Sequence, residues 1–143
     1  MNAHSPNQTV ITAYKDAPAR TITAGGVTYA YRELGPKGGI PVVFFVHLAA
    51  NLDNWDPRII DPIAKGHHVI TFDNRGLGAS SGQVPDTIEA MADDALTFIK
   101  ALGFDEIDIF SFSLGGMVVL VDFFGRGLDS VNIDGTDVSV ARL

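Results

Sequence analysis

Residues 107–116 read IDIFSFSLGG, and this stretch decides the fold. Its first six residues are typical of a short strand that is buried in a parallel sheet. A helix is expected to begin at Leu114, so the chain must turn sharply at Ser113. Such a turn requires small residues two positions before and after its apex, and Ser111 and Gly115 meet that requirement.

The turn is expected to place the Ser113 hydroxyl beyond the carboxyl end of its strand, where chemistry collects in open parallel sheets. Backbone N–H groups at the start of the following helix, beginning with Leu114, would point toward an anion that forms beside this hydroxyl. Acyl transfer requires a hydroxyl nucleophile next to such preorganised donors. The alternative is an ordinary serine in a glycine-rich turn between a strand and a helix.

Two earlier apolar runs, at 41–46 and 68–72, predict further buried strands of the same sheet. The first run is followed by HLAAN at 47–51. Because these residues are small, a backbone N–H in this loop can face the Ser113 hydroxyl as a second donor to an oxyanion. We assign that donor to Ala49.

The second run is followed by DNRGLGASSG at 73–82. A dinucleotide-binding loop of the form G-x-G-x-x-G would need glycine at position 81, which is serine. A nucleotide-binding βαβ module is therefore the weakest functional hypothesis. We interpret the segment as a structural loop in which Asp73 and Arg75 form an ion pair and the glycines adopt unusual dihedral angles.

The flanking segments complete one domain. Residues 1–18 are expected to be a flexible N-terminal arm, and 19–143 a single domain. Within it, 20–33 predicts a β-hairpin around Ala24-Gly25-Gly26. Residues 130–143 predict a short hairpin around Asp134-Gly135 or, alternatively, one strand beside the 107–112 strand.

Two helices are expected between the strands. The stronger one covers 88–102, with Asp86 as its cap and Gly103 as its end. The weaker one covers 54–65. The residues expected to face inward from the weaker helix are Ile59, Ile60 and Ile63. Strands that alternate with helices predict βαβ units and a parallel sheet.

Composition excludes several classes of function. The 143 residues are 46% hydrophobic, which suits one domain with a sizeable core. The net charge of −7 makes nucleic acid and membrane surfaces poor partners. There is no cysteine, which excludes thiolate metal sites, and we expect neither metal nor cofactor. The segment 1–15 does not read as a signal peptide, and polar residues interrupt the apolar stretch 107–124, so we expect a cytoplasmic protein.

Three motifs in this order, H-x-A-A from His47, D-N-R-G-x-G-x-S from Asp73 and S-x-S-x-G-G from Ser111, resemble the α/β-hydrolase family. The esterase, enol-lactonase and carbon–carbon hydrolase branch is the most similar, over roughly residues 20–120. The resemblance implies a mostly parallel sheet of about five strands flanked by helices. It also implies the strand order 1-2-4-3-5, with the N-terminal hairpin antiparallel at one edge.

Carried onto this chain, the resemblance implies Ser113 as the nucleophile and the backbone N–H groups of Ala49 and Leu114 as the oxyanion hole. The substrate would be an ester, a lactone or a related carbonyl compound. The sequence departs from the family pattern at Leu48 and Ser111, where glycine is commoner. In the family the acid and the histidine of the catalytic triad follow the nucleophile in the chain.

No histidine follows Ser113 in this sequence. His67 and His68 begin a strand at the end of the sheet away from the site, and His4 lies in the arm. We interpret His47 as a buried structural histidine, with a catalytic role as the alternative. These residues offer no convincing general base, so we expect a truncated, frame-shifted or fragmentary hydrolase fold.

Two functional hypotheses therefore remain. One is a serine hydrolase with weak or lost activity. The other is a non-catalytic fragment derived from a hydrolase, or a half-fold that assembles with itself. The second has a physical motive, because the 107–112 strand would have an open edge if the sheet stopped there, and an open edge invites pairing. Residues 131–140 can cover this edge within one chain, or a second copy can do so across a two-fold axis. We therefore expect a homo-oligomer formed through this sheet edge.

Overall fold

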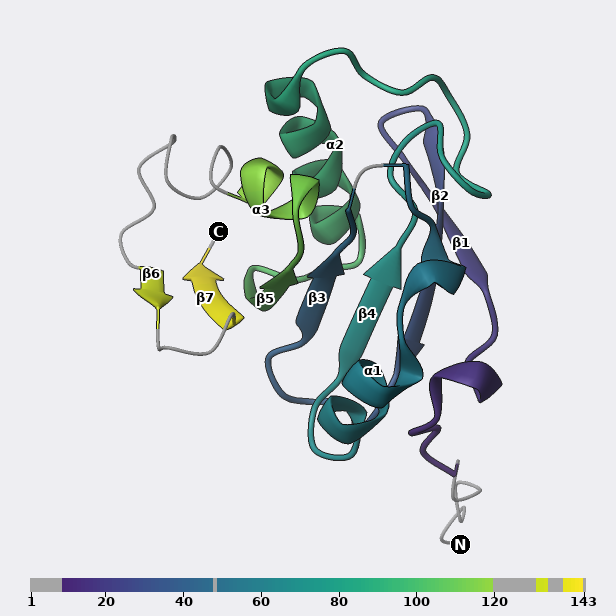
Figure 1. Cartoon of the computed structure of the whole chain (residues 1–143), viewed down its shortest axis with the longest axis vertical. Helices are drawn as coiled ribbons and strands as arrows, with labels where there is room; N and C mark the ends of the chain where they lie inside the picture. Colours follow the sequence, from purple (N-terminus) through teal and green to yellow (C-terminus); the bar gives the residue numbers. More distant parts are fainter. Residues whose placement is uncertain (1–8, 48, 120–130, 134–137, 143) are drawn as a thin grey trace, which may run out of the picture.

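The computed structural model describes residues 9–47, 49–119, 131–133 and 138–142, and places helices on both faces of one mixed sheet (Figure 1). The described strands follow the order β1-β2-β4-β3-β5-β7-β6. The strands are β1 (Arg20–Ala24), β2 (Val27–Leu34), β3 (Val42–Phe45), β4 (Val69–Phe72), β5 (Glu106–Ser111), β6 (Val131–Ile133) and β7 (Val138–Arg142). The helices are α1 (Pro57–Ala64), α2 (Ile88–Ala101) and α3 (Leu114–Val119), with short 3-10 turns η1 (Tyr14–Asp16) and η2 (Leu52–Asn54).

The first five strands confirm the expected order 1-2-4-3-5 and the expected flanking helices. β3 pairs in parallel with both β4 and β5, whereas β1 and β2 form an antiparallel hairpin that joins the sheet through β4. Gly25 and Gly26 form the hairpin turn, with φ of 57° and 79°. The carboxyl ends of β3, β4 and β5 therefore lie along one edge of the sheet, and the loops that follow them meet there.

Two alternatives were drawn from the sequence of 130–143, a hairpin or a strand beside the 107–112 strand, and the structure shows both. β6 and β7 form an antiparallel hairpin, and β7 also pairs with β5 in antiparallel fashion. The predicted turn at Asp134-Gly135 lies outside the described residues. The edge of β5 is thus covered within the same chain, which is one of the two alternatives drawn from the sequence. The other alternative, a homo-oligomer formed through this edge, is wrong because β7 already occupies it.

The central strands are buried on both faces. Val43 and Phe45 pack in the cluster that includes α2, whereas Val42 and Phe44 pack in the cluster that includes α1. Neighbouring residues of a strand point to opposite faces, so both sets must be apolar. This explains why the sequence of this strand lacks a polar alternation.

The strongest predicted helix is present, but its cap is different. The Thr87 hydroxyl accepts a hydrogen bond from the N–H of Ala90 (3.1 Å) and caps α2. The prediction of Asp86 is wrong because the cap must directly precede the first helical residue, and Asp86 is one position too early. At the other end Gly103, with φ of 87°, donates its N–H to the Lys100 carbonyl and ends the helix as expected.

The weaker helix is shorter than expected. α1 begins at Pro57, because the Asp56 carboxylate accepts the N–H of Arg58 (2.9 Å) and caps the helix there. Its inward face contains the fully buried Ile60. The prediction for Ile59 is wrong, since that side chain is 41% exposed.

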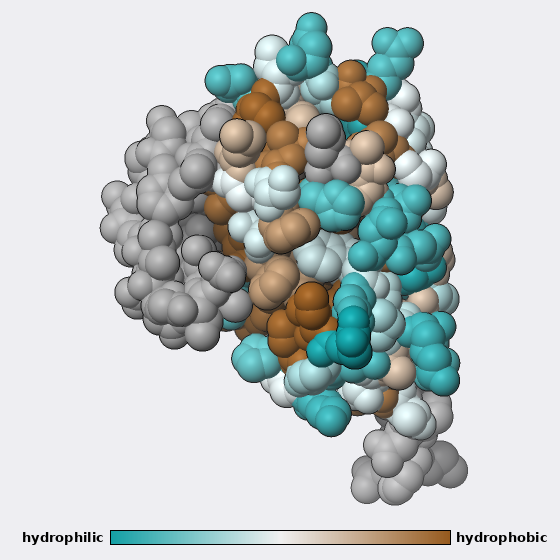
Figure 2. Space-filling view, viewed as in Figure 1, coloured by the Kyte–Doolittle hydropathy of each residue, from teal (hydrophilic) through white to brown (hydrophobic). Residues whose placement is uncertain are grey.

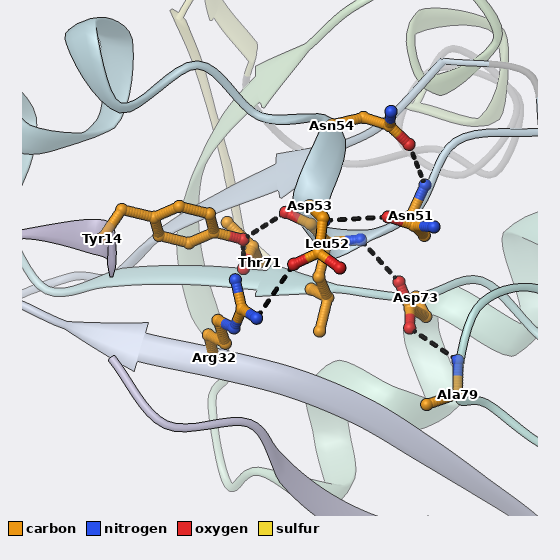
Figure 3. A network of polar contacts seen from close by, with 9 residues as sticks. All are labelled: Tyr14, Arg32, Asn51, Leu52, Asp53, Asn54, Thr71, Asp73 and Ala79. Carbon is orange, nitrogen blue, oxygen red and sulfur yellow. Dashed lines mark hydrogen bonds and ion pairs between the residues drawn. The ribbon is translucent and has the colours of Figure 1, made fainter. Parts of the chain in front are cut away.

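Part of the predicted flexible arm packs against the body of the protein. The Tyr14 side chain is 3% exposed. Its hydroxyl donates to the Leu52 carbonyl (2.7 Å) and lies 3.0 Å from the Thr71 hydroxyl (Figure 3). The prediction of a loose arm over 1–18 is therefore wrong around Tyr14, because its phenol group has buried partners far away in the sequence. Residues 1–8 lie outside the described part of the chain.

Candidate active site

Two residues at the carboxyl edge of the parallel strands have an unusual backbone conformation. Among the described residues other than glycine, only Ala49 (φ 57°) and Ser113 (φ 55°) lie in the left-handed region. This conformation costs on the order of 1 kcal/mol for a residue with a side chain. Such strain persists only where the surrounding structure enforces it, and it is concentrated at functional sites. The same two residues are the nucleophile and the oxyanion donor predicted from the sequence.

Ser113 lies at the apex of the turn between β5 and α3, and its side chain is exposed. Two backbone hydrogen bonds close the turn. The N–H of Gly115 donates to the Phe112 carbonyl (3.1 Å), and the N–H of Gly116 donates to the Ser113 carbonyl (2.9 Å). The strand thus gives way to a helix within two residues, Phe112 and Ser113, and this sharp turn leaves the hydroxyl at the surface.

The glycine at position 115 allows α3 to begin directly against the end of β3. A Cβ atom on Gly115 would overlap the carbonyl oxygen of Phe45. The same carbonyl accepts the N–H of Phe112 (3.2 Å), so it cannot easily move away. The close approach brings the turn that contains Ser113 next to the loop that follows β3 and contains Ala49.

Asp73 holds the loop that follows β3. Its buried carboxylate accepts one hydrogen bond from the N–H of Leu52 (2.8 Å) and one from the N–H of Ala79 (2.9 Å), as Figure 3 shows. One oxygen therefore fixes the loop after β3, and the other fixes the loop after β4. Within the first loop, Asn51 and Asn54 exchange side-chain and backbone hydrogen bonds that cap η2.

The predicted ion pair between Asp73 and Arg75 is wrong. The Arg75 guanidinium lies 3.6 Å from the carboxylate of Asp94 on α2, because the Asp73 carboxylate is used by the two loops. Gly76 and Gly78 have φ of 78° and 52°, in line with a structural loop, and a Cβ on Gly78 would overlap the Asp73 carboxylate. This role of Asp73 was not predicted, although an aspartate directly after a buried strand and before closely spaced glycines was a usable signal.

The histidines are divided between the two ends of the parallel strands. His47 follows β3 at the edge that carries the candidate site; its ring is half-buried and lies edge-on against Phe112, with 5.7 Å between ring centroids. The expectation of a buried histidine is thus met only in part, because the ring is half-buried. His67 and His68 precede β4 at the opposite end, as expected. His4 lies outside the described residues.

His68 belongs to a separate cluster of charged groups. Its Nε2 atom lies 3.0 Å from the Glu33 carboxylate, which also accepts a hydrogen bond from the Lys37 ammonium (3.1 Å). Burial raises the pKa of Glu33, but the hydrogen bonds from Lys37 and His68 outweigh burial, so the pKa lies below its ordinary value of 4.5.

Replacing this carboxyl by Glu33→Gln is expected to make the stability less sensitive to acid. A carboxyl whose pKa is lower in the folded state stabilises the fold fully above its unfolded pKa, and this contribution is lost as the pH falls through the folded pKa. Below about pH 4.5 the free energy of unfolding should thus fall more steeply for the unmodified chain than for Glu33→Gln. Urea unfolding at pH 7, 4 and 3 measures both slopes, and parallel curves would contradict the assignment.

The described part of the chain lacks two kinds of feature. It holds no group of three histidine, cysteine, aspartate or glutamate residues that could bind a metal ion. It also has no helix that is both long and apolar enough to cross a bilayer.

Known proteins give an independent comparison. The family model described as the alpha/beta hydrolase fold matches residues 40–121. A Rhizobium rhizogenes protein provisionally named carbamate hydrolase RutD is 41% identical over 68 residues, which is 46% of this chain and 26% of that protein. The 3-oxoadipate enol-lactonase 1 of Acinetobacter baylyi is 26% identical over 95 residues, covering 66% of this chain and 35% of the relative.

A solved structure gives a similar result. An alpha/beta hydrolase fold protein from Chitinophaga pinensis superposes with a TM-score of 0.74 and 46% sequence identity, over 76% of this chain and 40% of that protein. The chain therefore spans less than half of the length of each of these relatives. Their activities concern the complete proteins.

Proposed function

We propose that this chain, because it belongs to the α/β-hydrolase fold family, acts as a serine hydrolase on an ester, a lactone or a related carbonyl compound. The observation that carries the proposal is the backbone at Ser113, which is left-handed and exposed between β5 and α3. A strained turn of this kind between a strand and a helix is the nucleophile elbow of this fold. The relatives named as a carbamate hydrolase and an enol-lactonase support a carbonyl substrate.

In the proposed reaction the Ser113 hydroxyl oxygen attacks the carbonyl carbon of the substrate. The carbonyl oxygen becomes an oxyanion, which the backbone N–H groups of Ala49 and Leu114 stabilise by hydrogen bonds. The intermediate then expels the alcohol and leaves an acyl group on Ser113, which water removes in a second step. The left-handed backbone of Ala49 and the hydrogen bonds of Asp73 hold the first of these donors in place.

A base must accept the proton of the Ser113 hydroxyl during the attack. The sequence from 114 to 143 contains no histidine. We propose that the base comes from outside these residues, either from a further part of the protein or from a partner. Without it the acylation is slow. Triad enzymes that lose a member keep about 10³–10⁴-fold acceleration over water, through binding and the oxyanion hole.

The test measures the hydrolysis of 4-nitrophenyl acetate by the unmodified chain and by Ser113→Ala. We expect slow release of nitrophenol together with an acetylated protein in the mass spectrum, and we expect Ser113→Ala to lose the acetyl adduct and at least about tenfold in rate. The variant Ser111→Ala, two residues earlier in the same turn, should keep both signals. Identical traces for the unmodified chain and Ser113→Ala would refute a nucleophilic role for Ser113.

A second candidate function is a non-catalytic, self-assembling half-fold. Its support is the exposed apolar surface beside the candidate site, where Phe112 is 59% exposed and Met117 is 58% exposed. Figure 2 shows hydrophobic side chains gathered over α1 and at the end of the molecule near α2 and α3. Two copies that bury such surfaces against one another would be stabilised by the hydrophobic effect.

Self-association stays a prediction. Its basis is now the exposed apolar surface around Phe112 and Met117, and no longer the edge of β5. Light scattering at micromolar concentration should give a mass of about twice that of one chain. The double variant Phe112→Ser/Met117→Ser should shift the mass to that of a monomer. A monomeric unmodified chain would contradict the prediction. Residence in the cytoplasm likewise stays a prediction.

A further inference from the structure

A pocket of about 380 Å³ lies next to both proposed oxyanion donors. It extends from Ala49 and Leu114 to the loop before α2 and the first turn of that helix. The lining residues that matter here are Ala49, Leu77, Val84, Ile88, Met91 and Leu114. Apart from the two donors, the residues that line the pocket have no role in the proposed mechanism. All of them lie at or before Leu114 in the sequence.

We propose that this pocket binds a short, uncharged aliphatic acyl chain attached to the carbonyl carbon that Ser113 attacks. The inference rests on the proposed function, because Ser113 and Leu114 are adjacent in the chain and the pocket begins at Leu114. A carbonyl whose oxygen lies against the N–H groups of Ala49 and Leu114 has its acyl chain within reach of the side chains of the same two residues.

The size and lining of the pocket restrict the ligand. Ligand pockets commonly measure about 300–1,000 Å³, so this one is near the lower end and suits a small group. Its surface is almost entirely aliphatic, from side chains such as Leu77, Ile88 and Met91. Burying methylene groups there is favourable, whereas burying a charged group without a partner is not.

The sign of the nearby charge gives a second restriction. The pocket is also lined by Asp86, whose side chain is exposed, and the whole chain carries a net charge of −7. A carboxylate on the acyl chain would approach this negative group in a largely apolar surrounding and be repelled. Neutral acyl chains are therefore favoured over dicarboxylic acyl chains.

The first experiment measures acylation rates by intact-protein mass spectrometry with the 4-nitrophenyl esters of acetate, butyrate and hemisuccinate. Two additional buried methylenes should make butyrate react about tenfold faster than acetate. Hemisuccinate, which is about as long but anionic, should react at least about tenfold more slowly than butyrate. A ratio of butyrate to acetate near one, or a preference for hemisuccinate, would overturn the proposal while leaving the hydrolase function intact.

Val84→Trp tests whether the preference comes from this pocket. Val84 lines it and is 50% exposed, so a larger side chain can enter the pocket without disturbing the core. The ratio of butyrate to acetate should fall to about one in this variant. Ile59→Trp, at a comparably exposed aliphatic residue on α1 outside the pocket, is the matched control and should keep the ratio. Equal ratios in both variants would contradict the assignment.

A binding experiment keeps the inference testable even where no acyl adduct forms. Saturation-transfer NMR with ethyl butyrate and monoethyl succinate is carried out on Ser113→Ala, which lacks the proposed nucleophile. Ethyl butyrate should show transfer, monoethyl succinate should not, and Val84→Trp added to Ser113→Ala should abolish the ethyl butyrate signal. Absence of adducts combined with this pattern would reject the proposed function and retain the pocket. No ethyl butyrate signal, or one that Val84→Trp does not change, would overturn the pocket.

Discussion

Asp73→Asn is expected to lower the free energy of unfolding by about 2–3 kcal/mol. The Asp73 carboxylate is 2% exposed and accepts backbone N–H groups of Leu52 and Ala79, one on each oxygen. An amide has only one acceptor oxygen, so one of the two N–H groups would face an NH₂ group and lose its partner. A buried donor without a partner costs the full penalty of its desolvation.

Urea unfolding followed by circular dichroism measures this loss, and Asp53→Asn is the matched control. Asp53 forms an ion pair with Arg32 (2.9 Å), but its side chain is 75% exposed. Exposed ion pairs contribute little, so Asp53→Asn should cost less than about 1 kcal/mol. Equal losses in the two variants would mean that Asp73 does not hold the loops. Asp73→Asn should also slow acylation of Ser113, because the loop that contains Ala49 is released.

Gly115→Ala is expected to cost about 1–3 kcal/mol, although alanine favours helices over glycine. The new methyl group would overlap the carbonyl oxygen of Phe45, a backbone atom that also accepts the N–H of Phe112. Either α3 or the end of β3 must move, and the turn that contains Ser113 moves with it. The variant should therefore lose both stability and the acetyl adduct.

Gly116→Ala is the control for this prediction, one residue further along the same helix. A Cβ there would lie 3.7 Å from the Ser111 hydroxyl oxygen, which is ordinary contact. Since alanine favours the helix, this variant should be unchanged or up to about 1 kcal/mol more stable. Thermal unfolding of both variants decides between a steric effect at position 115 and a general effect of substitution in α3. Similar melting temperatures for the two would contradict the steric account.

The sequence predicted those features that depend on local pattern. Apolar residues without alternation indicated that β3 is buried on both faces, and the structure confirms this with Val43 and Phe44 in opposite clusters. The tight turn required a small residue at 115, which the Phe45 carbonyl explains. Gly103 indicated the end of α2, because its positive φ is a local property of the backbone.

Features that depend on partners far along the chain were not predictable. The Tyr14 phenol binds the Leu52 carbonyl 38 residues away, so the polar sequence around it gave no sign of burial. Asp73 was paired with Arg75 on proximity in sequence, whereas its true partners are backbone N–H groups of two loops. The predicted cap of α2 was wrong by one position for a different, local reason. Asp86 and Thr87 are both good caps, and only the exact first residue of the helix decides between them.

The central claim is that Ser113 is a nucleophile exposed at the apex of the turn between β5 and α3. Labelling with a fluorophosphonate probe, followed by proteolysis and mass spectrometric mapping of the adduct, tests it most directly. The account predicts one adduct, located on Ser113, that persists in Ser111→Ala. An adduct on any other residue, or no adduct under conditions in which the chain is folded, would contradict it.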